Sequence, residues 1–349
     1  MKLKRRILFV FLSLILITIL IVGFRAWGAY RKAFSINTPS TLPREVLLIP
    51  TGAALNDVLD SLEINGQILN RSFLEWTAAK MNYHDETVKK GRYIIPAGVS
   101  SKDLITLLRS GNQTPLSIAI HEVRSIEQLC GRVGTKLELD SFALWQWIDL
   151  HFDTMAGTEP ATRLTRFIPN TYEFYWTVTP EEFCKRMLKE NDRFWNESRR
   201  SSALAIGMSI EEVYTLASII EKETQYNPEK SRMAGVYLNR LRLGIPLQAD
   251  PTVVFAIGDF TIRRVLTAHL QVDSPYNTYQ HAGLPPGPIY MPSIASIDAV
   301  LNAEDHDYLY FCARPANEGP GHAFAATLQA HNVNAARYQR WLNAEGIFR

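Results

Sequence analysis

Residues 7–24 form a continuous uncharged and mostly apolar run, with four basic residues before it and three soon after it. The run is 18 residues long, which is near the lower limit for a helix that spans a bilayer. A cleavable signal peptide would have a shorter apolar stretch and small residues at a cleavage site, whereas Phe24, Arg25 and Trp27 follow here. We therefore expect residues 1–32 to be a cytoplasmic tip and an uncleaved, single-pass anchor. The alternative is a buried core helix of a soluble protein.

Residues 44–118 contain a weak internal repeat after a polar, Pro-containing stretch at 33–43 that we interpret as a stalk. The segment 49–59 aligns with 95–105, and each copy has the pattern of a strand, a Pro-Gly turn and an amphipathic helix. The pattern predicts strands at 44–50 and 91–96 and helices at 53–63, 71–81 and 100–109. This order resembles a LysM module, a type of domain that binds N-acetylglucosamine chains. A packing domain without ligand affinity is the alternative, because no aromatic stripe marks a sugar platform.

Residues 120–200 have mostly helical periodicity and are rich in aromatic residues. The segment 167–174 interrupts this pattern, because Pro169 and Asn170 are turn formers, and we expect it to lie against the helix that contains Glu221. The aromatic residues that we expect in a core or a groove are Trp145, Trp147, Phe152 and Trp195.

A helix is predicted to begin after Ser209, which forms a capping box with Glu212. An apolar stripe at 210, 213, 216, 217 and 220 leads to Glu221 at its edge. A carboxylate beside apolar side chains has a raised pKa, so Glu221 is our candidate general acid. Glu223 lies about 200° further around the helix, and we expect it to face water.

Composition and charge limit the function classes. With 46% hydrophobic residues in 349, the chain can fill the cores of two domains. The net charge is +2, but residues 1–32 contain seven basic and no acidic residues, which leaves −5 on the remainder. Binding to nucleic acid is therefore not indicated. The cationic residues before the apolar run favour a cytoplasmic N-terminus and an extracytoplasmic remainder. Cys130, Cys184 and Cys312 fit neither a disulfide framework nor a zinc site, and the eight histidines form no metal-binding motif.

Four further segments carry polar side chains among Pro and Gly, which suits rigid loops that recognise sugars. They are Gly-Val-Tyr-Leu-Asn-Arg-Leu (235–241), Pro-Leu-Gln-Ala-Asp-Pro-Thr-Val (246–253), Ser-Pro-Tyr-Asn-Thr-Tyr (274–279) and Gly-Leu-Pro-Pro-Gly-Pro-Ile (283–289). The last three, together with Leu-Ala-Ser-Ile-Ile-Glu-Lys-Glu (216–223), closely resemble the endolytic murein transglycosylases (the MltG or YceG-like family), in the family's order. The chain departs from that pattern at Asn170, where an acid is usual, and at Ala325 and Ala330.

The resemblance implies an α+β fold with a catalytic domain at 119–349, and a lytic enzyme that cleaves the β-1,4 bond between N-acetylmuramic acid (MurNAc) and N-acetylglucosamine (GlcNAc). It implies that the product has a 1,6-anhydromuramyl end. It also implies peptidoglycan strands and the cytoplasmic membrane as partners, together with peptidoglycan synthases, and no metal or cofactor. The expected catalytic residue is Glu221, and the expected substrate-binding residues are Gln248, Asp250, Tyr276, Asn277, Thr278, Tyr279 and His322.

Two other functions compete with this interpretation. The chain could be a non-catalytic, glycan-binding scaffold of the wall-synthesis machinery. It could also be a pyridoxal-phosphate enzyme similar to aminodeoxychorismate lyase, with Lys222 as the Schiff-base residue, although no Gly-rich phosphate loop precedes a helix.

Overall fold

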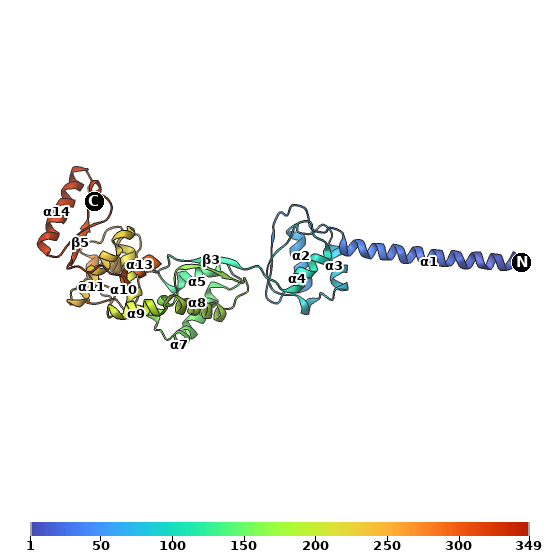
Figure 1. Cartoon of the computed structure of the whole chain (residues 1–349), viewed down its shortest axis with the longest axis horizontal. Helices are drawn as coiled ribbons and strands as arrows, with labels where there is room; N and C mark the ends of the chain where they lie inside the picture. Colours follow the sequence, from blue (N-terminus) through green and yellow to red (C-terminus); the bar gives the residue numbers. More distant parts are fainter. Residues whose placement is uncertain (1, 348–349) are drawn as a thin grey trace. The chain divides into compact units, whose positions relative to one another are not determined.

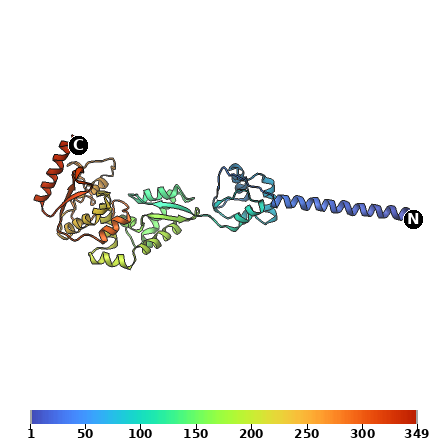
Figure 2. The ribbon, with the colours of Figure 1, turned by 45° about the horizontal axis from the view of Figure 1, so that its top comes forward.

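The computed structural model describes residues 2–347 and separates into two compact units (Figures 1 and 2). The first unit contains Met1–Leu116 together with Glu173–Val178, and the second contains Ser117–Tyr172 and Thr179–Arg349. Helices and short antiparallel strand pairs occur in both, so the expected α+β class is confirmed.

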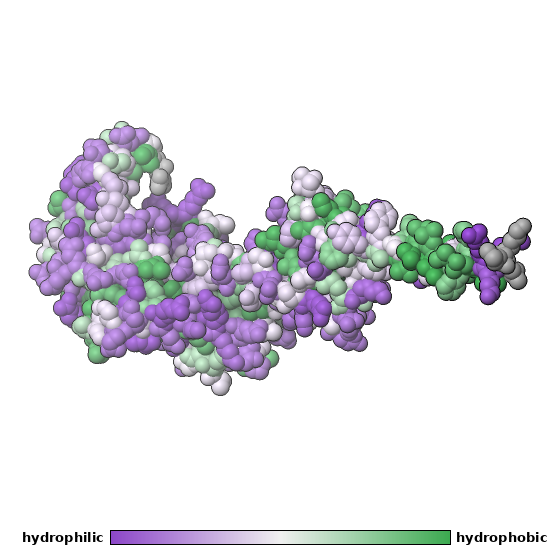
Figure 3. Space-filling view, turned by 45° about the vertical axis from the view of Figure 1, so that its right-hand side comes forward, coloured by the Kyte–Doolittle hydropathy of each residue, from purple (hydrophilic) through white to green (hydrophobic). Residues whose placement is uncertain are grey.

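The N-terminal helix α1 (Lys2–Phe34) is apolar along most of its length, and its apolar side chains are exposed. Within residues 2–347, it is the one unbroken helix that is long and apolar enough to cross a membrane. Figure 3 shows this helix as a green apolar surface that follows a polar tip. The helix is therefore compatible with a single-pass membrane anchor.

The remainder of the first unit has the predicted repeat. Strand β1 (Val46–Ile49) is followed by α2 (Leu55–Ile64) and α3 (Arg71–Lys80), and β2 (Gly91–Ile94) by α4 (Ser101–Ser110). The strands pair antiparallel, with Val46 opposite Ile94, and enclose a core that includes Leu47, Leu59 and Leu104. The predicted strands and helices of this region are confirmed to within a few residues at each end. The likeness to a LysM module stays a prediction.

The stretch at 33–43, which we interpreted as a stalk, packs against this unit. The side chains of Asn37 and Thr38 are buried. The Asn37 amide donates to Ser101 Oγ at 2.9 Å and to the Asn70 carbonyl at 3.0 Å, and its own oxygen accepts from the Asn70 N–H. A buried amide with these bonds fixes the chain locally, so this stretch is part of the folded unit and does not extend as a free stalk.

The first half of the second unit is mostly helical, as predicted. Phe152 and Trp195 are buried in its core, whereas Trp145 and Trp147 are partly exposed. The segment 167–174 lies against the helix Ile210–Glu223 (α10), which contains Glu221, as expected: the Tyr214 hydroxyl of this helix donates to the Phe167 carbonyl at 2.9 Å. The elements are β3 (Leu116–Ile120), α5 (Ile126–Gly134), α6 (Ser141–Trp147), a π-helical turn (Ile148–Phe152), α7 (Asp153–Ala156), a 3-10 helix (Pro160–Arg166), β4 (Asn170–Phe174), α8 (Pro180–Phe194) and α9 (Glu197–Ala205).

The second half of this unit is built around α10 (Ile210–Glu223), which begins at the predicted capping box. Every residue from Val213 to Ile220 is buried, so this helix is covered on all sides. Around and after it come α11 (Lys230–Arg242), α12 (Asp250–Ile257), α13 (Ile294–Leu301), the hairpin β5 (Tyr310–Ala313) and β6 (His322–Ala325), and α14 (Leu328–Ala344), with 3-10 turns at Asn227–Glu229, His269–Gln271 and Ala316–Glu318.

The loop 283–289 has a glycine that its packing requires. A methyl group at Gly287 would collide with the carbonyl oxygen of Ala161, which belongs to the 3-10 helix of the first half. Further along this loop, the Ile289 N–H donates to Ser218 Oγ on α10 at 3.0 Å. Gly287 therefore lets the loop pass close to the rest of the unit and lie along the central helix.

Candidate active site

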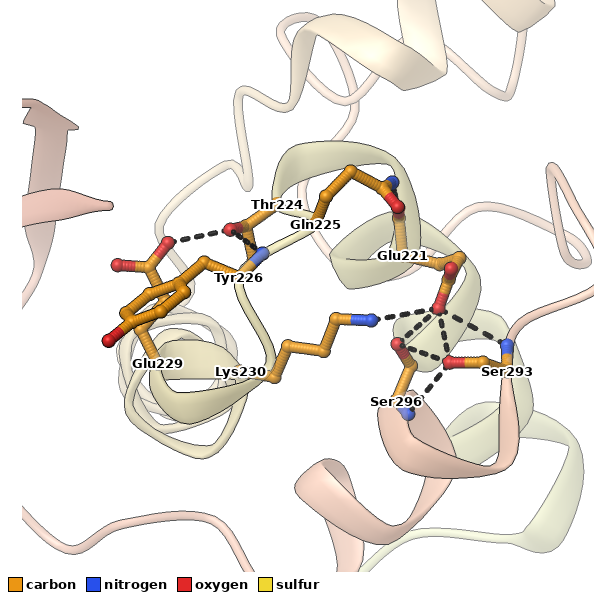
Figure 4. Close-up of polar contacts among 8 residues, drawn as sticks. All are labelled: Glu221, Thr224, Gln225, Tyr226, Glu229, Lys230, Ser293 and Ser296. Atoms are coloured by element: carbon orange, nitrogen blue, oxygen red, sulfur yellow. Dashed lines mark hydrogen bonds and ion pairs between the residues drawn. The ribbon is translucent and has the colours of Figure 1, made fainter. Parts of the chain in front are cut away.

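The last turn of α10 carries two carboxylates, Glu221 and Glu223, in different surroundings. The side chain of Glu221 is directed to the N-terminus of α13, where Ser293 is the N-cap residue (Figure 4). The side chain of Glu223 contacts Tyr237 of α11 instead. The helix places the two on opposite sides, as its periodicity predicts.

One oxygen of Glu221 accepts four hydrogen bonds. Lys230 Nζ lies 3.0 Å from Oε2, the hydroxyls of Ser293 and Ser296 lie at 2.5 and 2.6 Å, and the Ser293 N–H lies at 3.2 Å (Figure 4). Burial by itself raises the pKa of Glu221, but the two serine hydroxyls and the Lys230 ammonium outweigh burial and hold the pKa below its ordinary value. The expectation that this pKa is raised is wrong, because the site supplies charge and donors along with burial.

Glu223 has the environment that we had expected for Glu221. Burial, the largest cause, and the charge of Asp250 raise the pKa of Glu223, whereas the Tyr237 hydroxyl, which donates to Glu223 Oε1 at 3.0 Å, and the charge of Arg240 lower it. Together they bring this pKa to about 7. The expectation that Glu223 faces water is wrong. Glu223 is partly buried: it contacts Tyr237 of α11, and it lines a cavity.

A cavity of about 310 Å³ opens beside this carboxylate. Glu223 and Asp250 line it together, whereas the Glu221 carboxylate is held by Lys230 and α13. The other lining residues are cationic, aromatic or aliphatic: Arg124, Lys222, Pro251, Val254, Phe255, Phe260, Ile262, Arg263, Val265, Ile289 and Tyr290. The cavity combines two carboxylates with cationic groups and with apolar and aromatic surfaces, and such a combination is typical of a site that binds a small polar ligand.

Of the seven predicted substrate-binding residues, Asp250 lines this cavity, Tyr279 and Tyr276 contact its lining residues, and Gln248 lies two positions before Asp250. Asp250 is the first residue of α12 and lines the cavity, and the Tyr279 hydroxyl donates to its Oδ1 at 2.6 Å. Tyr276 packs its ring against Phe255 of the cavity wall, with centroids 4.8 Å apart. Gln248 has a left-handed backbone with φ of 50°, and its N–H donates to the Thr278 carbonyl at 3.0 Å.

The other three predicted residues hold loops together. The buried Asn277 amide donates to the carbonyls of Leu270 and Val272 at 3.0 and 2.9 Å. Thr278 Oγ1 is buried and accepts from the Ala249 N–H at 3.0 Å, which fixes the start of α12. His322 Nδ1 lies 2.8 Å from Glu229 Oε1, so its ring is engaged within the protein. For these three side chains the geometry supports a structural role.

Sequence reasoning missed the partners that distinguish the two carboxylates: Lys230, Tyr237, Ser293 and Ser296. Ser293 precedes an apolar helical segment, which is a recognisable N-cap pattern. No sequence signal pairs it with Glu221, 72 positions earlier. Tyr237 lies in the segment 235–241, which we expected to be a loop; that expectation is wrong, because the segment belongs to α11. Its partner Glu223 could be identified only from the packing of α11 on α10.

The fold and the site define an α+β protein whose central buried helix ends in a carboxylate-lined cavity. The sequence model of the YceG-like family matches residues 47–337, and the chain belongs to this family.

Relatives with names and structures agree with this membership. An endolytic murein transglycosylase of Bacillus subtilis (strain 168) is 38% identical over 171 residues, 49% of this chain and 46% of the relative. One of Streptococcus pneumoniae serotype 2 is 28% identical over 323 residues, 83% of this chain and 57% of the relative. The chain thus spans about half the length of these relatives. A crystal structure of a YceG-like protein from Listeria monocytogenes has a TM-score of 0.56 and 30% identity, and the match covers 82% of this chain and 97% of that one.

Proposed function

We propose that this chain is a lytic transglycosylase that cleaves peptidoglycan glycan strands. Its relatives in Bacillus subtilis and Streptococcus pneumoniae are named endolytic murein transglycosylases. The observation that carries the proposal is the cavity at the end of α10, where Glu223, with a pKa of about 7, shares the lining with Asp250. Carboxylates with a pKa near the working pH are suited to donate and then accept a proton.

Between the two carboxylates of α10, Glu223 is the better candidate for the acid. Glu221 has a lowered pKa and is held by Lys230, so it lacks a proton to donate near neutral pH. Glu223 has a raised pKa of about 7, which favours its protonated form relative to an ordinary carboxyl, and it lines the cavity. We therefore assign the proton transfer to Glu223, and we interpret Glu221 as a residue that fixes the end of α10 against α13.

The reaction needs one carboxylate that acts twice. Protonated Glu223 gives its proton to the glycosidic oxygen between MurNAc C1 and GlcNAc O4, and that C–O bond breaks. The C6 hydroxyl of the same MurNAc attacks C1 and releases its proton to the Glu223 carboxylate, which restores the acid and leaves a 1,6-anhydro end. The attacking hydroxyl is tethered to the reacting ring, so proximity supplies part of the rate. The Asp250 charge can stabilise the positive charge that develops at C1.

The proposal is tested by the chemistry of the product. Purified glycan strands incubated with the full chain should yield fragments that end in 1,6-anhydromuramic acid. Mass spectrometry distinguishes these ends from reducing ends, because each anhydro end is lighter by one water. Reducing ends would show that the enzyme is a hydrolase with an activated water. Tight binding without any fragments would favour the non-catalytic scaffold.

The Tyr237 hydroxyl sets the pH range of activity. It donates to Glu223 and favours the charged form, so Tyr237→Phe should raise the pKa of Glu223 above about 7. Because the protonated acid starts the reaction, kcat/KM should fall as pH rises through this pKa. We expect the variant's alkaline limb to lie at higher pH, by about one pH unit for a hydrogen bond to a charged group. A pH profile with an unmoved or lower limb would contradict the assignment of Glu223.

The membrane anchor gives the proposal its location. Helix α1 is compatible with a single span, and its N-terminal basic residues favour a cytoplasmic tip. We propose that the second unit lies on the extracytoplasmic side, where peptidoglycan lies, and that synthases can act beside it. Protease added to intact spheroplasts should then degrade the second unit, and full protection would contradict this orientation.

A further inference from the structure

One wall of the active-site cavity is formed by cationic side chains and aromatic rings. The Arg124 guanidinium lies 4.4 Å from the centroid of the Phe260 ring and 5.7 Å from that of Tyr290. The Lys222 ammonium lies 4.7 Å from the centroid of the same Tyr290 ring. Arg263 lines this cavity as well, and the three cationic residues come from three separate segments.

Across residues 2–347, no ion pair joins Arg124, Lys222 or Arg263 to a carboxylate. Lys230, by contrast, is neutralised by Glu221 at 3.0 Å. The wall therefore brings to the cavity three cationic groups that make no direct ion pair with a described carboxylate, although Glu223 and Asp250 line the same cavity.

The aromatic rings prepare these cations for an anionic ligand. A guanidinium that lies over a ring keeps its N–H donors at its edge, where they can bind a carboxylate through two parallel hydrogen bonds. Stacking on a ring also limits the freedom of the long side chain, which reduces the entropy lost on binding. Glu223 and Asp250 line the same cavity, so the ligand must present an anion to the cationic wall and neutral atoms to the two carboxylates.

We propose that Arg124, Lys222 and Arg263 form a carboxylate subsite for the substituent on O3 of the muramyl ring. This inference rests on the proposed function and adds its substrate specificity. MurNAc carries a lactyl carboxylate when the strand is bare, and a stem peptide with its own carboxylates when it is not, whereas GlcNAc carries neither. Because the two sugars alternate, an anion subsite sets the register of the strand. It places the bond on the C1 side of MurNAc at Glu223, and it disfavours the other bond.

The test compares charged and neutral strands. The first substrate is a bare strand with free lactyl carboxylates, and the second is the same strand with these groups converted to methylamides. We measure kcat/KM from the formation of anhydro ends on each substrate for the wild type and for Arg124→Gln, Lys222→Gln and Arg263→Gln. Lys136→Gln is the matched control, because Lys136 is exposed and lies outside the cavity lining. We expect the wild type to prefer the charged strands, and Arg124→Gln to lose about tenfold on charged strands with little change on neutral ones.

Peptide-bearing strands form the third arm and identify the source of the carboxylate. A loss on bare strands assigns the subsite to the lactyl group, and a loss confined to peptide-bearing strands assigns it to the stem peptide. Equal losses on charged and neutral strands, or no loss with any of the three variants, would overturn the proposal. Arg124→Lys, which retains the charge, should retain part of the preference.

Failure of this inference can be separated from failure of the proposed function. If the wild type forms no anhydro ends on any strand, the transglycosylase assignment itself is wrong. If it forms them at equal rates on charged and neutral strands, the enzyme assignment stands and the carboxylate subsite is rejected. Binding of the charged and neutral strands to the inactive Glu223→Gln variant gives a second readout that does not depend on turnover.

Discussion

Glu223→Gln should lower the formation of anhydromuramyl ends by about a thousandfold, within the range that a positioned general acid contributes. Glutamine has nearly the same shape and can still accept the hydrogen bond from Tyr237, but it has no proton to give to the glycosidic oxygen. We expect the variant to fold, because the substitution removes a partly buried acid without leaving an unpaired charge. The measurement is single-turnover cleavage of purified strands, with the thermal unfolding midpoint recorded alongside.

The matched control for this experiment is Glu221→Gln on the same helix turn. The sequence favours Glu221 as the general acid, and if that were correct, Glu221→Gln would abolish activity. We expect Glu221→Gln to retain activity within about tenfold of the wild type at temperatures where it is folded, because the rate loss of a general acid, 10²-fold or more, does not apply to it. The reverse outcome, an inactive Glu221→Gln beside an active Glu223→Gln, would return the catalytic role to Glu221.

The choice between these two residues shows where sequence reasoning stops. The capping box at Ser209 and the repeat in residues 44–118 are local patterns, and both were predicted with nearly correct bounds. The apolar stripe of α10 predicted one buried face and one solvent-exposed face. Residues 213–220 are all buried, so the stripe does not identify a solvent-exposed face. Glu223 contacts α11 instead. Helical periodicity predicts the angle between two side chains but not which residues or solvent surround each of them.

Other elements were missed for a similar reason. Strand β4 begins at Asn170, directly after Pro169, and these two turn-forming residues predict a turn at this position. The strand forms because β3 pairs with it, which the local sequence does not predict. The strands of the β5–β6 hairpin are four residues each, too short for a clear alternation. The loops that carry Gln248, Asn277 and Thr278 were expected to be rigid, and hydrogen bonds hold each of them in the structure. The side chains of Asn277 and Thr278 and the backbone N–H of Gln248 make these bonds, so sequence alone could not separate the residues that build the site from those that bind a ligand in it.

The pKa values of Glu221 and Glu223 are shifted in opposite directions. Serine hydroxyls and an ammonium lower the pKa of Glu221, whereas burial and the charge of Asp250 raise that of Glu223. This difference in pKa within one helix turn allows the charged Glu221 to hold the helix end while Glu223 keeps a proton for the reaction. The contacts of Glu221 matter because the last turn of α10 positions Glu223 relative to the cavity.

Lys230→Met should destabilise the fold by about 3 kcal/mol, because it leaves the charge of Glu221 buried without its cation. The side chains of Lys230 and Glu221 are only 3% and 14% exposed, so water cannot replace the lost partner. In thermal or urea unfolding of the second unit, the double variant Glu221→Gln with Lys230→Met should be more stable than Lys230→Met alone, because it removes both charges.

Lys185→Met provides the matched control. Its pair with Glu181 is 62% and 55% exposed, and its loss should cost less than about 1 kcal/mol. If Lys230→Met unfolds like the wild type, or if the double variant is the least stable of the set, the ion pair does not anchor α10, and Glu221 needs another explanation.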